Sequence, residues 1–279
     1  MKRADADLNP YACSCPHDHD EISLKKQFGQ HFLRDQAVVD EMLESVTLTE
    51  HSSVCEIGCG DGFLTESILD HHPERVWSFE IDPEWVEYMR RECQNPALML
   101  FEEDILQVDL ERLVLHKPWI LLSNVPYQIT FPLLYRIHAH RHLFSEGAIM
   151  IQEEVAQKIC ASSGREYGVQ SLFFQHYFTW NLLCKVPPTA FVPPPKVYSR
   201  VLHFKPREHK PEIPDEEKFW RFVKLCFAKP RRTLQNNIRA THYVTYAELL
   251  KDWAHLRAQQ MTFDDFLTAW NAIRSASIR

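Results

Sequence analysis

The tetrapeptide Asn124-Val125-Pro126-Tyr127 combines residue types that suit chemistry on an amino group. An aromatic amine is a poor nucleophile because its lone pair is delocalised into the ring. The side-chain oxygen of Asn124, with a backbone carbonyl at Val125 or Pro126, can accept the amine hydrogens as a new bond to nitrogen forms. Pro126 fixes the turn in advance, and Tyr127 offers a face on which an extruded base can stack. The pattern predicts group transfer to an amine or amide nitrogen, with a plain β-turn as the alternative.

A glycine-rich turn supplies the second chemical feature. Three of the seven glycines, Gly58, Gly60 and Gly62, lie just after Glu56. Glycine lets a chain turn sharply after a strand and approach a ligand closely. The G-x-G-x-G spacing differs from the G-x-G-x-x-G of dinucleotide binders. It favours S-adenosylmethionine, which has no pyrophosphate, over a tight turn without a ligand. This cofactor carries an already activated methyl group, so positioning and polarisation suffice and no general base is required.

Two acidic residues follow the next two predicted strands. Glu80 ends a strand about 20 residues after the turn, where a carboxylate can accept hydrogen bonds from both ribose hydroxyls. Asp104 follows the next strand and is placed to reach the adenine amine of the cofactor. Either acid alone has a solvated loop carboxylate as its alternative. Three features in order at three successive strand ends favour a cofactor site.

The elements that must position these residues form a regular alternation. Short apolar runs alternate with helix-period segments such as 131–137, which is the pattern of a parallel sheet with crossover helices. The proline-rich segment 187–195 is predicted to be neither helix nor interior strand, and the pattern after Pro206 is helical with charged faces. Strands are predicted at 53–57, 76–81, 98–101, 119–122 and 148–151, with 182–186 and 197–204 as a closing pair.

This alternation predicts an α/β fold with two domains. We expect a Rossmann-like methyltransferase domain at 21–206, with a mostly parallel seven-stranded sheet, and a small all-helical domain at 207–279. Residues 1–20 are predicted to be a flexible tail. In that tail Cys13, Cys15, His17 and His19 alternate, but zinc sites usually space their cysteines by two to four residues, so we predict no metal.

Composition excludes several classes of protein. The chain is 45% apolar and 25% charged, as in ordinary globular proteins, and no run approaches the ~20 apolar residues of a membrane span. The first 20 residues show no targeting pattern, and the eight cysteines are scattered. We therefore expect a cytoplasmic protein with reduced thiols.

The net charge of −7 is unevenly distributed. From Arg207 onward there are 13 Lys/Arg against 9 Asp/Glu, a local charge of +4, and the remainder has 18 against 29, or −11. Because phosphate binding depends on Lys and Arg, the smaller, basic part is the candidate nucleic-acid surface.

Taken together, these residues resemble the KsgA family of small-subunit rRNA adenine dimethyltransferases, which are relatives of the Erm enzymes. The resemblance covers roughly residues 25 to 240, and its specificity comes from several motifs in order. The matching motifs are 27–33 (QFGQHFL), 56–62 (EIGCGDG), 124–127 (NVPY), 151–156 (IQEEVA), 164–168 (GREYG), 191–199 (FVPPPKVYS) and 229–237 (KPRRTLQNN).

The resemblance implies a role for each matching position. Asn124 and Tyr127 are similar to the family's catalytic pair, and Phe191 looks like the second aromatic residue that packs against the target adenine; read without the family, Phe191 could instead be a core residue. Lys229, Arg231 and Arg232 are expected to contact RNA phosphates from a helix, with a solvated helix face as the alternative. The implied cofactor-binding residues are His31, Leu33, Gly58, Glu80, Asp104 and Asn124.

The activity implied by the resemblance is N6,N6-dimethylation of two adjacent adenines in the 3′-terminal hairpin loop of 16S rRNA. The expected partner is the immature small ribosomal subunit, and the protein is expected to act as a monomer in ribosome biogenesis. Two positions depart from the family, Val125 in place of Leu and Cys59 in place of Pro. Neither removes a reacting group.

Other functions are compatible with parts of this pattern. An assembly checkpoint factor would bind the immature subunit and scarcely need catalysis, but the intact Asn124 and Tyr127 favour chemistry. An Erm-like enzyme would modify large-subunit rRNA, and a DNA adenine methyltransferase would share the tetrapeptide. The segment with Arg231 and Arg232 favours the KsgA type over both.

Overall fold

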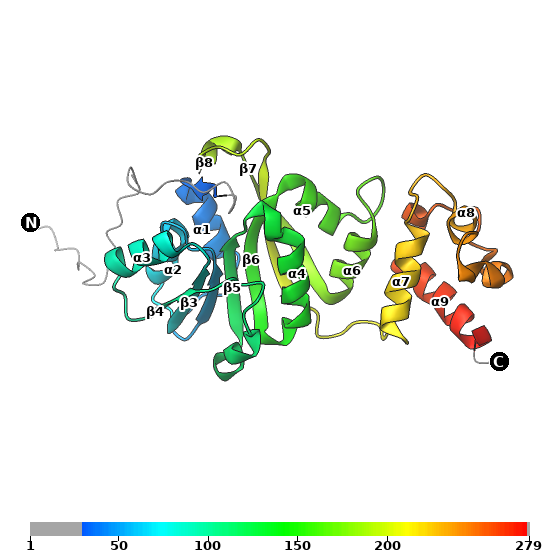
Figure 1. Ribbon diagram of the computed structural model, residues 1–279, viewed down its shortest axis with the longest axis horizontal. Helices are drawn as coiled ribbons and strands as arrows, with labels where there is room; N and C mark the ends of the chain where they lie inside the picture. The colour runs from blue at the N-terminus through cyan, green and yellow to red at the C-terminus, as the bar shows by residue number, and fades with distance from the viewer. Residues whose placement is uncertain (1–29, 278–279) are drawn as a thin grey trace, which may run out of the picture. The chain divides into compact units, whose positions relative to one another are not determined.

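The computed structural model describes residues 30–277, and within this range the chain forms a seven-stranded sheet and a separate helical unit (Figure 1). The predicted α/β class, with a mostly parallel seven-stranded sheet, is confirmed. No helix among these residues is long and apolar enough to cross a membrane. The strands, in sheet order, are β4 (Leu98–Glu102), β3 (Arg75–Glu80), β2 (Ser53–Ile57), β5 (Trp119–Asn124), β6 (Phe144–Gln152), β9 (Ser199–Pro206) and β7 (Phe178–Val186).

The five strands β2 to β6 run parallel to one another, and β9 and β7 complete the sheet beside β6. β2 pairs in parallel with β3 and β5, and β9 pairs antiparallel to β6. Every residue of β2 is buried, as are the first five of β5. Strands of a parallel sheet that is covered on both faces are buried along their length and are mostly apolar. The predicted closing pair, β7 and β9, are indeed neighbours, although β9 lies between β6 and β7.

Helices cover the sheet, and their boundaries follow local chemistry. Asp35 caps α1 by accepting a hydrogen bond from the Ala37 N–H, and Asp82 caps α3 in the same way, with Pro83 at its first position. Apolar faces of α1, α2 and α3 join strands β2, β3 and β6 in one buried cluster. The helices that begin in this part of the chain are α1 (Gln36–Glu44), α2 (Phe63–Leu69), α3 (Pro83–Glu92), α4 (Thr130–Ala139) and α5 (Glu153–Cys160).

A second sheet of two short strands was not predicted. β1 (Phe32–Leu33) pairs antiparallel with β8 (Phe191–Val192), and the Arg34 N–H extends the pairing to the Ala190 carbonyl at 2.8 Å. Within the segment 187–195, which was predicted to be neither helix nor interior strand, Phe191 and Val192 thus form one strand of this separate small sheet. Two-residue strands have no periodicity that a sequence pattern could show.

The second compact unit comprises residues 157–179 and 207–279. It has its own core, in which Phe219, Phe222 and Trp270 are buried. Tyr167 and Leu172 belong to that core too, so the unit takes in a segment that the sequence pattern grouped with the sheet domain. Its helices are α6 (Val169–Tyr177), α7 (Glu216–Cys226), α8 (Leu234–Ile238) and α9 (Phe263–Ser277), with 3-10 turns between α8 and α9.

Candidate active site

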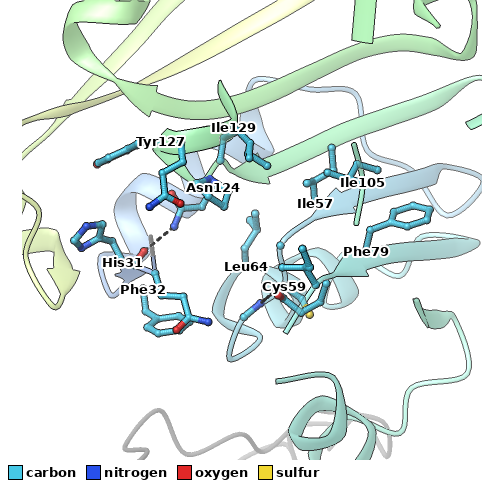
Figure 2. A pocket seen from close by; sticks show the side chains of 18 of the residues that line it. His31, Phe32, Ile57, Cys59, Leu64, Phe79, Ile105, Asn124, Tyr127 and Ile129 are labelled. Atoms are coloured by element: carbon cyan, nitrogen blue, oxygen red, sulfur yellow. Dashed lines mark hydrogen bonds between the residues drawn. The ribbon is translucent and has the colours of Figure 1, made fainter. Parts of the chain in front are cut away.

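A cavity of about 320 Å³ lies at the carboxyl ends of the central strands (Figure 2). Its walls come from the loops after β2, β3, β4 and β5, with the segment before β1 along one side. This is the edge at which open α/β sheets bind their ligands. Seven predicted site residues line this one cavity: His31, Leu33, Gly58, Glu80, Asp104, Asn124 and Tyr127.

The glycine turn forms the floor of the cavity between β2 and α2. Gly58, Gly60 and Gly62 all have positive φ, of 75°, 52° and 91°, which L side chains rarely adopt. At Gly60 a Cβ would also lie 2.7 Å from the Phe32 ring. The turn therefore needs glycine both for its backbone conformation and for the close approach of the amino-terminal segment.

Glu80 presents its carboxylate at the end of β3, and both oxygens are held by the backbone. Oε2 accepts a hydrogen bond from the Gly60 N–H at 3.0 Å, and Oε1 accepts one from the Asp82 N–H at 2.9 Å. Glu80 is only 7% exposed, and burial raises the pKa of its carboxyl despite these bonds. Each oxygen keeps further lone pairs, so the group is oriented to accept two ribose hydroxyls.

Glu56 lies beneath the same turn and is fully buried. The Thr65 hydroxyl faces both carboxylate oxygens, at 3.0 and 2.8 Å. Burial raises the pKa of Glu56 to about 7, with nearby Glu80 adding to the rise and the Thr65 bond opposing it. The sequence marked Glu56 only as the start of the turn, whereas the structure shows a second buried carboxyl behind Glu80.

Asp104 lies after β4, and its own loop holds its carboxylate. Oδ1 accepts a hydrogen bond from the Leu106 N–H and Oδ2 one from the Gln107 side chain, both at 2.9 Å. The loop is fixed further by Arg136 of α4, which donates to the Leu106 carbonyl at 2.7 Å. Asp104 is thus set at the cavity wall, where an adenine amine can meet it.

Apolar residues beside the acids complete the wall of the cavity, and they were not predicted from the sequence. Ile81 follows Glu80 directly, and Ile105 and Leu106 follow Asp104; all three line the cavity. Ile81 is 44% exposed, which is unusual for an isoleucine at the end of a buried strand. An apolar residue next to each acid was the available signal, since an adenine ring needs apolar faces as well as a polar edge.

Asn124 points from the end of β5 towards His31 (Figure 2), and its Nδ2 donates to the His31 carbonyl at 3.0 Å. A carbonyl only accepts, so this contact fixes which end of the amide is the nitrogen. The Asn124 Oδ1 has no hydrogen-bond partner in the part of the chain that the structure describes. That oxygen is therefore available to accept a hydrogen from a substrate amine.

Tyr127 follows two residues after Val125, whose N–H is tied to the Met150 carbonyl of β6 at 3.0 Å. The Tyr127 ring lies 5.8 Å, centroid to centroid, from the His31 ring. The Tyr127 hydroxyl lies 2.6 Å from the Ser199 Oγ. The ring is half-buried, and burial raises the pKa of the Tyr127 hydroxyl. The structure thus brings Asn124 and Tyr127 to one wall of the cavity.

Phe191 does not join that wall. It is 2% exposed and packs in the core cluster of the sheet domain, where β8 pairs it with Leu33. The prediction that this ring packs against the target adenine needs an exposed face, which the ring lacks here. In this structure Phe191 is a core residue, the alternative that its sequence left open, because the strand pairing turns it inward.

The segment before α1 is tied to the site at several points that the sequence did not reveal. Arg34 forms an ion pair with the buried Asp61 of the glycine turn, and the Gln30 side chain donates to Asp82 at 2.9 Å. His31 Nδ1 lies 2.7 Å from the Pro193 carbonyl. Residues 30–34 therefore contact both the glycine turn and the proline-rich loop. They also carry the His31 carbonyl, which orients the Asn124 side chain.

The predicted phosphate-binding residues Lys229, Arg231 and Arg232 lie in the second unit and are exposed. They form a turn between α7 and α8, and not the helix that was predicted. The buried Asn237 stabilises this turn: it accepts from the Lys229 N–H at 3.1 Å and donates to the Cys226 carbonyl at 2.8 Å.

Two further arginines join Arg231 around a groove of about 940 Å³ in this unit. Arg165 comes from the loop before α6 and Arg257 from the segment before α9. Both are exposed. They are far from Arg231 in sequence, so only the fold shows that these cations share one groove.

The described residues contain no group of three or more His, Cys, Asp or Glu that could hold a metal ion. The alternating Cys13, Cys15, His17 and His19, and the whole predicted tail, lie outside the described residues. The cysteines within 30–277 are all free.

Fold and site together define a Rossmann-like S-adenosylmethionine-dependent methyltransferase. A dimethyladenosine transferase from Plasmodium falciparum has the same fold, with a TM-score of 0.76 and 21% identity, over 88% of this chain and 98% of that one. The 23S rRNA methyltransferase ErmE gives a TM-score of 0.67 at 22% identity, over 87% and 99% of the two chains. At these identities the likeness concerns the fold alone.

Sequence comparison is more specific. The model of the ribosomal RNA adenine dimethylase family matches residues 22–274. The ribosomal RNA small subunit methyltransferase A of Chlorobium phaeobacteroides is 34% identical over 261 residues, which are 92% of this chain and 94% of that protein. The chain therefore belongs to the ribosomal RNA adenine dimethylase family.

Proposed function

We propose that this protein transfers methyl groups from S-adenosylmethionine to the N6 atoms of two adjacent adenines in the 3′-terminal hairpin loop of 16S rRNA. The observation that carries this proposal is the placement of Asn124. Its amide oxygen, without a protein partner among residues 30–277, opens into the same cavity as the glycine turn and Glu80. Family membership and the similarity to small-subunit methyltransferases support the choice of substrate.

The residues of the cavity fit the cofactor. Glu80 has two oriented oxygens for ribose hydroxyls, Asp104 lies where an adenine amine can donate to it, and Gly58 leaves the turn open to close approach. When bound, the cofactor supplies a methyl group on a positively charged sulfur. Because that group is already activated, the protein's contribution is to hold both reactants in line and to exclude water.

The target base meets Asn124 and Tyr127. The Tyr127 ring provides a stacking surface for an adenine turned out of its loop, a contact worth about 1–3 kcal/mol. The Asn124 oxygen accepts a hydrogen bond from the N6 amine, which localises the nitrogen lone pair towards the incoming methyl carbon. As the nitrogen gains a bond to the methyl carbon, the bond from that carbon to sulfur would break and leave its electron pair on sulfur. The nitrogen then gives up one proton to solvent, so no side chain has to act as a strong base.

The groove of the second unit is the proposed RNA-binding surface. Arg165, Arg231 and Arg257 surround it, and Lys229 and Arg232 lie on the same exposed turn as Arg231. Contacts from such side chains to phosphates position RNA without reading its sequence. We further propose that the protein acts as a monomer in the cytoplasm, on the immature small subunit and within ribosome biogenesis.

The test is methyl transfer from labelled S-adenosylmethionine to immature small subunits, with the modified nucleosides identified by mass. N6,N6-dimethyladenosine at two adjacent positions near the 3′ end of the small-subunit rRNA is the expected product. Label confined to large-subunit rRNA would overturn the choice of substrate. Tight binding to the subunit with no label would overturn the proposed activity in favour of an assembly factor.

A further inference from the structure

The Tyr127 ring is anchored by a residue outside its own loop. Its hydroxyl lies 2.6 Å from the Oγ of Ser199, a residue 72 positions later in the chain. Ser199 is fully buried at the start of β9, where it pairs with Gln152 of β6. One polar contact therefore joins the stacking ring to the core of the sheet.

The end of β9 that carries Ser199 is itself firmly held. Arg200 Nε and Nη2 donate to the two carboxylate oxygens of Glu153, at 2.6 and 2.9 Å, and Nη1 donates to the Leu183 carbonyl at 2.7 Å. On the other side of Ser199, the Tyr198 carbonyl accepts from the Glu153 N–H at 3.0 Å. Both neighbours of Ser199 are thus fixed, so Ser199 is a rigid point of attachment.

Two further contacts of Tyr127 do not fix the tilt of its ring. The Thr130 hydroxyl donates to the Tyr127 carbonyl at 3.1 Å, which fixes the backbone and not the ring. The His31 ring lies 5.8 Å away, centroid to centroid, at an interplanar angle of 32°, a loose and tilted contact. The Ser199 contact is made by the hydroxyl oxygen, the atom of the side chain farthest from the backbone. A contact at this position restrains the tilt of the ring more than one close to the backbone.

We propose that Ser199 is a positioning residue for methyl transfer. Its hydrogen bond sets the tilt of the Tyr127 ring, so that a base stacked on this ring brings N6 to the Asn124 oxygen. This inference rests on the function proposed above. A displacement of about 1 Å at the reacting atoms can cost ~100-fold in rate, so a small change in tilt has a large effect.

The Tyr127 hydroxyl itself takes no part in proton transfer. Burial raises the pKa of this hydroxyl above its ordinary value, so it stays protonated near neutral pH and is not a base. Its role is mechanical, as the point at which Ser199 holds the ring. Removal of either partner of the bond should therefore have the same consequence for catalysis.

The experiment compares Ser199→Ala, Tyr127→Phe and the double variant in methyl transfer to small subunits. Each single variant should lower kcat about tenfold, the effect of removing one hydrogen bond. The double variant should be no worse than the singles, because all three break the same hydrogen bond. Binding of S-adenosylhomocysteine, measured by calorimetry, should be unchanged in all of them.

Ser53→Ala is the matched control for loss of a buried serine. Ser53 is 4% exposed at the start of β2, on the opposite edge of the sheet, and its Oγ accepts from Arg75 Nη1 at 3.0 Å. Ser53→Ala and Ser199→Ala should lower the thermal unfolding temperature by similar amounts, while Ser199→Ala alone lowers kcat.

Two results would overturn the inference while the proposed function stands. One is a Ser199→Ala protein with wild-type kcat. The other is a double variant whose loss is the product of the single losses, because independent effects multiply. A wild-type protein that methylates no adenine would instead overturn the proposed function, and this inference with it.

Discussion

Two buried glutamates lie at opposite edges of the same sheet and have opposite surroundings. Glu80, at the carboxyl end of β3, accepts hydrogen bonds from backbone N–H groups of Gly60 and Asp82, and burial raises its pKa. Glu146, near the start of β6, accepts from His203 Nε2 at 3.0 Å and lies 3.1 Å from Lys205 Nζ. The Thr47 N–H adds a third donor at 3.0 Å.

These surroundings change the carboxyl pKa in opposite directions. For Glu146, burial alone would raise the pKa, but the donors from His203, Thr47 and Lys205 outweigh it and lower the pKa from 4.5 to about 2. Glu56, behind Glu80, rises instead to about 7. The amino edge of the sheet neutralises its own buried charge and so contributes to stability. At the carboxyl edge, Glu80 and Glu56 form no ion pair with a cation among residues 30–277, which suits a ligand that brings hydroxyl donors and positive charge.

If the carboxyl edge of the sheet carries the chemistry and the amino edge contributes stability, the largest expected effect is a loss of kcat on mutation at the carboxyl edge. Asn124→Ala removes the oxygen that we propose polarises the target amine, and it should lower kcat by about 10²–10³, as loss of one transition-state hydrogen bond does elsewhere. Affinity for S-adenosylhomocysteine should fall by less than threefold, a change of ~0.6 kcal/mol. Single-turnover transfer and calorimetry give the two values, and an equal loss in both would show that Asn124 mainly holds the cofactor.

The comparison is sharpened by Glu146→Gln, which should reduce stability and leave the site intact. Its pKa is lowered in the folded state, so the carboxylate stabilises the fold above pH 4.5, and this contribution is lost as pH falls from 4.5 towards 2. At neutral pH we expect a loss of about 1–3 kcal/mol in the free energy of unfolding. Denaturation at pH 7 and at pH 3 measures it.

The difference between Glu146→Gln and the wild-type protein should shrink at the lower pH. Cofactor affinity should be unchanged, which makes this variant the control for the next. A variant that lost cofactor binding while it kept its stability would contradict the proposed division between the two edges.

Glu80→Gln should have the reverse effect, with a smaller magnitude. The amide keeps one acceptor oxygen for the ribose but loses the charge, so affinity for S-adenosylhomocysteine should fall about tenfold. In the wild-type protein, affinity should also fall as pH drops through the raised pKa of Glu80, because the protonated acid is a poorer acceptor. That pH dependence should be weaker in Glu80→Gln. Stability at pH 7 should change less than in Glu146→Gln, because removal of a buried charge offsets the loss of one acceptor for the Gly60 or Asp82 N–H.

The same comparison shows what could be predicted from the sequence. The strand ends that carry Glu80, Asp104 and Asn124 follow from local apolar runs, because a buried parallel strand is mostly apolar. The cavity contacts of these residues follow as well, since parallel strands end at one edge. Local pattern therefore predicts the sheet, its order of chemical features and most residues of the pocket wall.

Long-range pairing could not be predicted in this way. β1 and β8 have two residues each, too few to show a period, yet their pairing buries Phe191 and places the His31 carbonyl against Asn124. Arg165 and Arg257 reach the groove of Arg231 only through the fold of the second unit. Residues 229–232 were expected to be helical, but they form a turn that the Asn237 side chain stabilises through hydrogen bonds.

The smallest expected effect concerns that groove, which differs from the pocket because its cations are exposed, so that their proposed action on RNA would be through screened charge. Replacing Arg231 and Arg257 together by alanine should weaken subunit binding and lower the slope of log affinity against log salt by about 0.7–0.9 for each phosphate that the variant no longer neutralises. Lys218→Ala with Lys224→Ala is the matched control, because both are exposed cations of α7 in the same unit and do not line the groove. Filter binding across a salt series measures the slopes. Equal slopes for the two double variants would mean that Arg231 and Arg257 contribute to RNA binding only through the net charge of the protein. A reduced slope in the arginine variant alone would mean that these two residues contact phosphates.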